Sequence, residues 1–119
     1  MNIVIETRNF DLTPSLKSYI NKKFEPLEKF IPASADAKLI EVEIERDTHH
    51  RHGEVFVARV KVGIVGLYAE GEGETAFAAV DDVEADIKRE LRRHKAKRQT
   101  NLLKSDRELK KRLKGGEAA

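Results

Sequence analysis

The sequence predicts an α+β fold, a two-layer sandwich in which a four-stranded sheet carries two helices on one face. Apolar residues recur at helical spacing in two segments and alternate with polar residues in others, and the predicted elements follow the order β-α-β-β-β-α. The 119 residues are enough for one domain. The initial β-α-β unit requires a right-handed crossover and a parallel strand pair, and the three later strands can form an antiparallel meander.

The N-terminal half is predicted to contain a strand, a helix and a second strand. Residues 2–7 hold a β-branched run that is typical of a strand. Thr13 is placed to cap a helix that has Pro14 at its first position, and Pro26 is expected to kink or end that helix. Residues 38–46 alternate apolar residues with glutamates, which predicts a strand with one buried and one wet face.

The C-terminal half is predicted to add two strands and a long helix. Residues 55–65 predict a third strand after a polar hairpin loop, and a fourth strand is expected from Leu67 to about Glu72. Apolar residues then recur at helical spacing, so a long helix is expected from about Ala76 to Arg98 or slightly beyond.

The chain is predicted to divide into a functional domain at residues 1–98 and a basic C-terminal tail at residues 99–119. The tail has few apolar residues, which predicts a flexible segment. Ser105 and Glu108 resemble a capping box, so a short helix around residues 106–114 is the alternative.

The composition excludes several classes of protein. The chain has no cysteine, so disulfides and cysteine-based zinc sites are excluded and a cytoplasmic location is expected. No stretch approaches the roughly 20 apolar residues that a membrane-spanning helix needs. The N-terminus lacks the apolar run that is typical of a signal peptide.

No set of residues typical of an enzyme is visible in the sequence. It has no evident Ser/His/Asp or Cys/His nucleophile arrangement, and Gly71 and Gly73 lack the lysine and hydroxyl residue of a phosphate-binding loop. His49, His50 and His52 share a predicted hairpin loop, but no acidic or cysteine partner stands at established metal-ligand spacing. We expect a solvated or RNA-adjacent loop there, and no catalytic residue, metal, cofactor or small-molecule substrate.

Positive charge is concentrated at the end of the predicted long helix. Residues 88–98 hold seven lysines and arginines against one glutamate, although the whole chain has a formal net charge of +2. Complementing the helix dipole needs charge in one turn only, at less than ~1 kcal/mol per charge. Like charges at this spacing repel each other, and the phosphates of a nucleic acid offset that repulsion. A nucleic acid is therefore favoured over the alternatives, which are a solvated face and an acidic protein or membrane surface.

A helical wheel separates these basic residues by their position around the long helix. Opposite the apolar stripe we expect Arg89, Arg92 and Arg93. At its margin we expect Lys88 and Lys95, and on the line of the stripe itself His94 and Arg98. The stripe thus changes from apolar to basic, as expected where the last turns extend beyond the sheet and face a polar partner.

The first helix adds further lysines, among them Lys22 and Lys23. Lys23 falls within the arc of the apolar stripe, so it is either a lysine whose stem lies at the stripe's edge or part of a basic surface shared by two helices. Structured RNA is favoured over DNA as the partner, because the start of the long helix is acidic and the exposed strand face carries glutamates rather than stacking aromatics.

Several segments resemble one known family. They are the helix start LTPSLKSYINKKF with the LEKF that follows, the hairpin HHRHGEVFVARVKV, and above all AFAAVDDVEADIKRELRRHKAK. Over about residues 1–98, the chain resembles the ribosome hibernation-promoting factors, also called ribosome-associated inhibitors or sigma-54 modulation proteins. The resemblance implies a β-α-β-β-β-α fold with both helices on one sheet face, similar to a double-stranded-RNA-binding domain.

The resemblance also implies a non-enzymatic inhibitor of translation in idle ribosomes. The implied partners are the 30S small ribosomal subunit with its 16S rRNA and the 70S ribosome, with no membrane, and the implied site is the groove that holds mRNA and tRNAs. Carried over by position, contacts would come from Lys23, Arg89, Arg93, Lys95 and Lys97. With the residues from the helical arrangement, the predicted rRNA-binding set is Lys22, Lys23, Lys88, Arg89, Arg92, Arg93, Lys95, Lys97 and Arg98.

Two positions depart from the pattern of the family that the chain resembles. Pro26 stands where many members have a basic residue, and Asp86 stands where some have lysine. The short stretch after residue 98 is similar to a short form of the family, because the long forms carry an additional C-terminal dimerisation domain. Two other functions stay open: a general structured-RNA-binding module or RNA chaperone, and a regulatory domain that binds a protein partner.

Overall fold

The computed structural model describes residues 2–31, 39–48, 55–63 and 66–117, with the backbone alone described at residues 98, 99 and 101–117. The elements follow the order β-α-β-β-β-α that the sequence predicts, with one additional 3₁₀ helix, η1. Their bounds are β1 Asn2–Arg8, α1 Pro14–Phe24, η1 Glu25–Phe30, β2 Leu39–Asp47, β3 Val55–Val62, β4 Leu67–Gly73 and α2 Ala76–Glu117.

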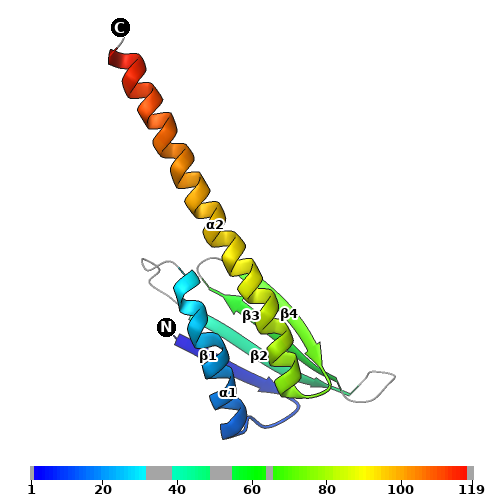
Figure 1. The fold of residues 1–119 in the computed structure, drawn as a ribbon. Coiled ribbons are helices and arrows are strands. Elements are labelled where there is room, and N and C mark those ends of the chain that lie inside the picture. The colour runs from blue at the N-terminus through cyan, green and yellow to red at the C-terminus, as the bar shows by residue number, and fades with distance from the viewer. Residues whose placement is uncertain (1, 32–38, 49–54, 64–65, 118–119) are drawn as a thin grey trace.

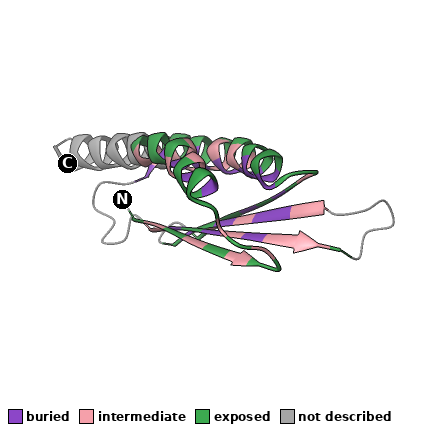
Figure 2. Ribbon diagram, turned by 90° about the horizontal axis from the view of Figure 1, so that it is seen from below, coloured by how far each residue is buried: buried purple, intermediate pink, exposed green. Residues whose placement is uncertain are grey.

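The four strands form a single sheet with the order β1-β2-β3-β4. β1 pairs with β2 in parallel, and the pairs β2–β3 and β3–β4 are antiparallel. Both helices cover the same face of the sheet and leave the other face open (Figure 1, Figure 2). The predicted fold class, a two-layer α+β sandwich, is therefore confirmed.

The core lies between this sheet face and the two helices. Strand residues that alternate along β2 and β3 point into it and meet the apolar stripes of α1 and α2. No polar or charged side chain is buried among the described residues. The fully buried side chains include Ile20, Phe24, Ile40, Val42, Ile44, Val60, Val62, Val80, Val83, Ile87 and Leu91.

The start and end of α1 follow from the residues that the sequence singles out. The Thr13 hydroxyl accepts a hydrogen bond from the Leu16 amide at 3.2 Å, and Pro14 occupies the first turn. The α-helix ends at Phe24 and Pro26 lies in η1, as expected because proline has no backbone N–H to donate to an α-helical hydrogen bond. Because the chain tightens into η1 at this point, Lys29 and Phe30 are brought against α2.

The close contact between α2 and β4 depends on two glycines. A Cβ atom at Gly71 would lie 2.5 Å from the Val83 backbone nitrogen, and one at Gly73 would lie 2.5 Å from that of Ala79. The Asp82 carboxylate also accepts a hydrogen bond from the Glu72 amide at 2.9 Å. The glycines therefore set how closely the long helix approaches the sheet, a role that the sequence analysis did not assign to them.

The length of α2 differs from the sequence-based prediction. The helix runs without interruption to Glu117, so the expected end near Arg98 and the separate short helix at residues 106–114 are both wrong. No glycine or proline occurs between residues 75 and 114, and lysine, arginine and leucine are good helix formers. Figure 1 shows that the second half of α2 projects beyond the sheet.

Truncation after Arg98 tests whether this projecting part of α2 contributes to the stability of the domain. We expect the free energy of unfolding to change by less than about 0.5 kcal/mol, as for surface changes, because Leu91 is the last buried apolar residue of α2 among the side chains that the structure describes. Thermal unfolding followed by circular dichroism checks this. A fall of about 2 kcal/mol or more would instead show that the leucines beyond Arg98 dock on the domain.

Candidate nucleic-acid interface

The basic side chains of α2 take the positions that the helical arrangement predicts. Arg89, Arg92, Arg93 and Lys97 are exposed, while Lys88 and Lys95 are partly buried. Arg98 lies in α2, but its side chain is outside the described part of the chain. The helix face that points away from the sheet therefore carries a row of cations along the turns before its projecting part.

Two of these arginines are paired with acids of their own helix. Arg89 Nη2 lies 3.0 Å from Asp86 Oδ1, and Arg93 Nη1 lies 3.4 Å from Glu90 Oε1. Exposed pairs of this kind are worth less than about 1 kcal/mol, so an incoming phosphate can replace the carboxylate. The pairing still lowers the net charge that Arg89 and Arg93 present.

Lys23 of α1 is held by an acid of α2. Its ammonium lies 3.3 Å from Asp81 Oδ1, and the Tyr19 hydroxyl donates a hydrogen bond to the same oxygen. The hydrogen bond to Asp81 raises the pKa of Lys23 and also raises the pKa of Tyr19. The Tyr19 ring packs edge-on against Phe77, with the centroids 5.1 Å apart. Lys23 thus belongs to a link between the two helices, whereas its neighbour Lys22 is exposed.

Three cations gather around one aromatic ring where η1 meets α2. The charged groups of Lys29, Arg92 and Lys95 lie 5.2, 5.4 and 5.9 Å from the centroid of Phe30. Lys95 Nζ also donates a hydrogen bond to the Lys29 carbonyl oxygen at 3.3 Å. The helical wheel predicts Arg92 opposite the apolar stripe and Lys95 at its margin, but it assigns no role to Phe30, because only the fold brings that ring to α2.

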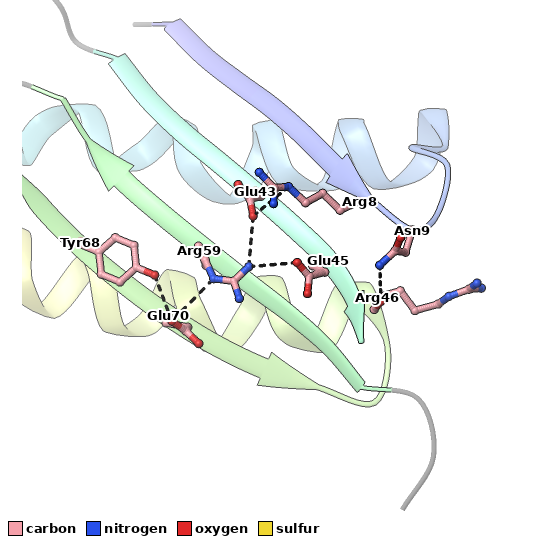
Figure 3. A network of polar contacts seen from close by, with 8 residues as sticks. All are labelled: Arg8, Asn9, Glu43, Glu45, Arg46, Arg59, Tyr68 and Glu70. Carbon is pink, nitrogen blue, oxygen red and sulfur yellow. Dashed lines mark hydrogen bonds and ion pairs between the residues drawn. The ribbon is translucent and has the colours of Figure 1, made fainter. Parts of the chain in front are cut away.

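The open face of the sheet carries the opposite charge. Its glutamates surround Arg59, whose guanidinium lies 3.2 Å from Glu43, 3.7 Å from Glu45 and 3.8 Å from Glu70 (Figure 3). The Tyr68 hydroxyl donates a hydrogen bond to Glu70 at 3.0 Å. An acidic face of this kind repels phosphate. The charge distribution therefore favours the basic turns of α2 over the open face of the sheet as the contact for a polyanion.

Comparison with known proteins identifies the family. Residues 3–99 match the family model described as Sigma 54 modulation protein / S30EA ribosomal protein. The chain belongs to this family. The match covers the whole sandwich together with the basic turns of α2, so the family resemblance noted in the sequence is confirmed.

Curated relatives of this Sigma 54 modulation / S30EA protein are about a quarter identical to it over the matched residues. The ribosome hibernation promoting factor of Klebsiella oxytoca is 26% identical over 97 residues, which are 82% of this chain and 96% of that one. The ribosome hibernation promotion factor of Bacillus subtilis is also 26% identical over 97 residues, but these are only 50% of its length.

Solved structures share the fold of this family member. A ribosomal subunit interface protein from Coxiella burnetii has a TM-score of 0.58 at 21% identity, over 81% of this chain and 99% of that one. The N-terminal domain of Thermus thermophilus Protein Y has a TM-score of 0.57 at 18% identity, over 79% of this chain and 99% of that one. At these identities the likeness concerns the arrangement of helices and strands.

The described part of this Sigma 54 modulation / S30EA protein holds neither a metal-ligand cluster nor a membrane-spanning helix. Within residues 2–31, 39–48, 55–63 and 66–97, no group of three or more His, Cys, Asp or Glu side chains could hold a metal ion. His49, His50 and His52, for which we expect a solvated or RNA-adjacent loop, lie outside the described residues. Among the described helices, none is both long and apolar enough to cross a membrane.

Proposed function

We propose that the protein is a ribosome hibernation factor, which binds the 30S small subunit in the mRNA and tRNA groove and inhibits translation in idle 70S ribosomes. The observation that carries this proposal is the segregation of charge, with cations on the helical side and glutamates on the open face of the sheet. Relatives that are named ribosome hibernation promoting factor support it. The proposal places the protein in the cytoplasm, where idle ribosomes are found.

The proposed contact is electrostatic and follows the shape of the RNA backbone. Cations of α1 and α2 would neutralise phosphates of 16S rRNA and release their counterions, while the acidic sheet face would point away from the RNA. Such a mechanism needs occupancy of the groove and no covalent chemistry, so no catalytic residue is assigned. The proposed rRNA-binding residues are Lys22, Lys23, Lys88, Arg89, Arg92, Arg93, Lys95, Lys97 and Arg98.

Sedimentation of the purified protein with 30S subunits tests the proposed site. We expect saturable binding of about one copy per subunit, and most of it should be lost when mRNA and initiator tRNA already occupy the groove. The physical reason is that α1 and α2 cannot share one groove with an anticodon stem and mRNA.

The alternative functions give different results in the same sedimentation experiment. Unsaturable binding, or equal binding to unrelated structured RNA, would indicate a general RNA-binding module or chaperone. A protein partner that stays bound after nuclease treatment, without any binding to 30S subunits, would indicate a regulatory protein-interaction domain.

A further inference from the structure

We propose that Lys29, Arg92 and Lys95 form a phosphate-binding notch at the junction of η1 and α2, in which Phe30 is the positioning residue. The ligand class is the phosphodiester backbone of structured RNA. The inference rests on the proposed function and deepens it, because it names the part of the basic surface that holds phosphate most tightly.

The notch is assembled from two elements that are distant in sequence. Lys29 comes from η1, whereas Arg92 and Lys95 lie almost one turn apart on α2. All three charged groups lie within 5.9 Å of the centroid of one ring, so any two are separated by at most twice that distance. The hydrogen bond from Lys95 Nζ to the Lys29 carbonyl ties the two elements together at this point.

Within the described part of the chain the cations of the notch have no acidic partner, unlike three other cations of the two helices. Arg89 is paired with Asp86, Arg93 with Glu90 and Lys23 with Asp81. Three unpaired cations around one ring repel one another. A lysine ammonium has three donors and an arginine guanidinium has five, so donors remain for phosphate oxygens after Lys95 has bonded to the Lys29 carbonyl.

Phe30 can position these cations because its own ring is fixed. The ring is partly buried and packs against the core, and η1 ends with a hydrogen bond of 3.0 Å from the Ile31 amide to the Glu28 carbonyl oxygen. The negative face of an aromatic ring attracts ammonium and guanidinium groups. Because free lysine and arginine side chains lose rotamer freedom when they bind, holding them near the ring beforehand lowers the entropy cost of taking up a phosphate.

A salt titration of binding to 30S subunits, with full-length protein, compares two sets of three neutral substitutions. For K29Q/R92Q/K95Q we expect the slope of log K against log salt to fall by about two units, at ~0.7–0.9 per phosphate contact. The matched set R89Q/R93Q/K97Q also removes three positive charges, all of them from α2. Both of its arginines are already paired with acids, so we expect the slope to fall by only about one unit. An equal or larger fall for the matched set would overturn the notch.

Substitution of Phe30 separates positioning from packing. Phe30→Leu keeps apolar volume but removes the ring face, so we expect binding to 30S subunits to weaken about three- to tenfold, as for the loss of one to two cation–π contacts. Phe30→Tyr keeps the ring face, so this variant should bind 30S subunits as tightly as wild type. All variants are compared at a temperature where circular dichroism shows them folded.

Nuclear magnetic resonance supplies a signature that packing alone does not produce. The ε-methylene protons of Lys29 and Lys95 should be shifted by the ring current in the wild type and in Phe30→Tyr, and should lose that shift in Phe30→Leu. Wild-type affinity in Phe30→Leu would overturn the positioning role, whatever the stability of the variant.

The notch and the proposed function fail in different ways. If wild-type protein competes with mRNA and tRNA but K29Q/R92Q/K95Q binds 30S subunits as well as wild type, the notch is wrong and the proposed function stands. If wild-type binding is insensitive to mRNA and tRNA, yet the same variant loses affinity and salt slope, the proposed groove is wrong and the notch stands.

Discussion

Replacing Gly71 by alanine should lower the free energy of unfolding by about 2–3 kcal/mol, near the upper end of the cost of overpacking. The added Cβ would lie 2.5 Å from the Val83 nitrogen and 3.0 Å from its Cα. Backbone atoms of a helix cannot rotate out of the way as a side chain can. α2 would therefore have to move off β4, and its buried valines would lose contact with the sheet.

Gly73→Ala should have a similar effect, since its Cβ would lie 2.5 Å from the Ala79 nitrogen. Gly63→Ala is the matched control, because its nearest neighbours would be at 3.8 Å, an ordinary contact, and the Gly63 amide can still donate to the Leu39 carbonyl oxygen. We expect the control to stay within about 0.5 kcal/mol of wild type. Urea unfolding measures all three, and equal stability of Gly71→Ala and Gly63→Ala would contradict the close approach.

Translation should stop almost completely when the protein is added to empty ribosomes before mRNA, at a ratio of about one copy per ribosome. This expectation follows from the proposed function, in which inhibition comes from occupancy without turnover. Added after an initiation complex has formed, the same amount should inhibit much less, because mRNA and tRNA already fill the groove. A cell-free translation assay with both orders of addition measures the difference.

Two controls separate occupancy of the groove from other mechanisms of inhibition. The K29Q/R92Q/K95Q variant should need more protein for the same inhibition, since it would bind rRNA phosphates less tightly. Equal inhibition in both orders of addition would place the site outside the groove. Full inhibition at about one copy per hundred ribosomes would point to an enzyme, since occupancy cannot act below stoichiometric amounts.

Much of the fold follows from local features of the sequence. Alternating glutamates along residues 38–46 predict which face of β2 is open, and Thr13 and Pro26 predict where α1 begins and ends. Each of these features affects only the few residues next to it in the chain, through backbone dihedrals, helix caps and the period of apolar side chains. The length of α2 is a local property too, and the predicted end near Arg98 is wrong because low apolar content does not end a helix that contains no glycine or proline between residues 75 and 114.

The sequence by itself determined the order of elements, the apolar stripes and the identity of the basic residues near the end of α2. Only the tertiary structure decided how residues of α1 and η1 meet those of α2. It pairs Lys23 with Asp81 and sets Phe30 among Lys29, Arg92 and Lys95, through contacts such as Lys29–Lys95 that span 66 positions. Periodicity assigns a residue to a helix face, but the partners of that residue depend on how the helices pack on the sheet. Glycines such as Gly71 control this packing, because they allow α2 to approach β4 closely.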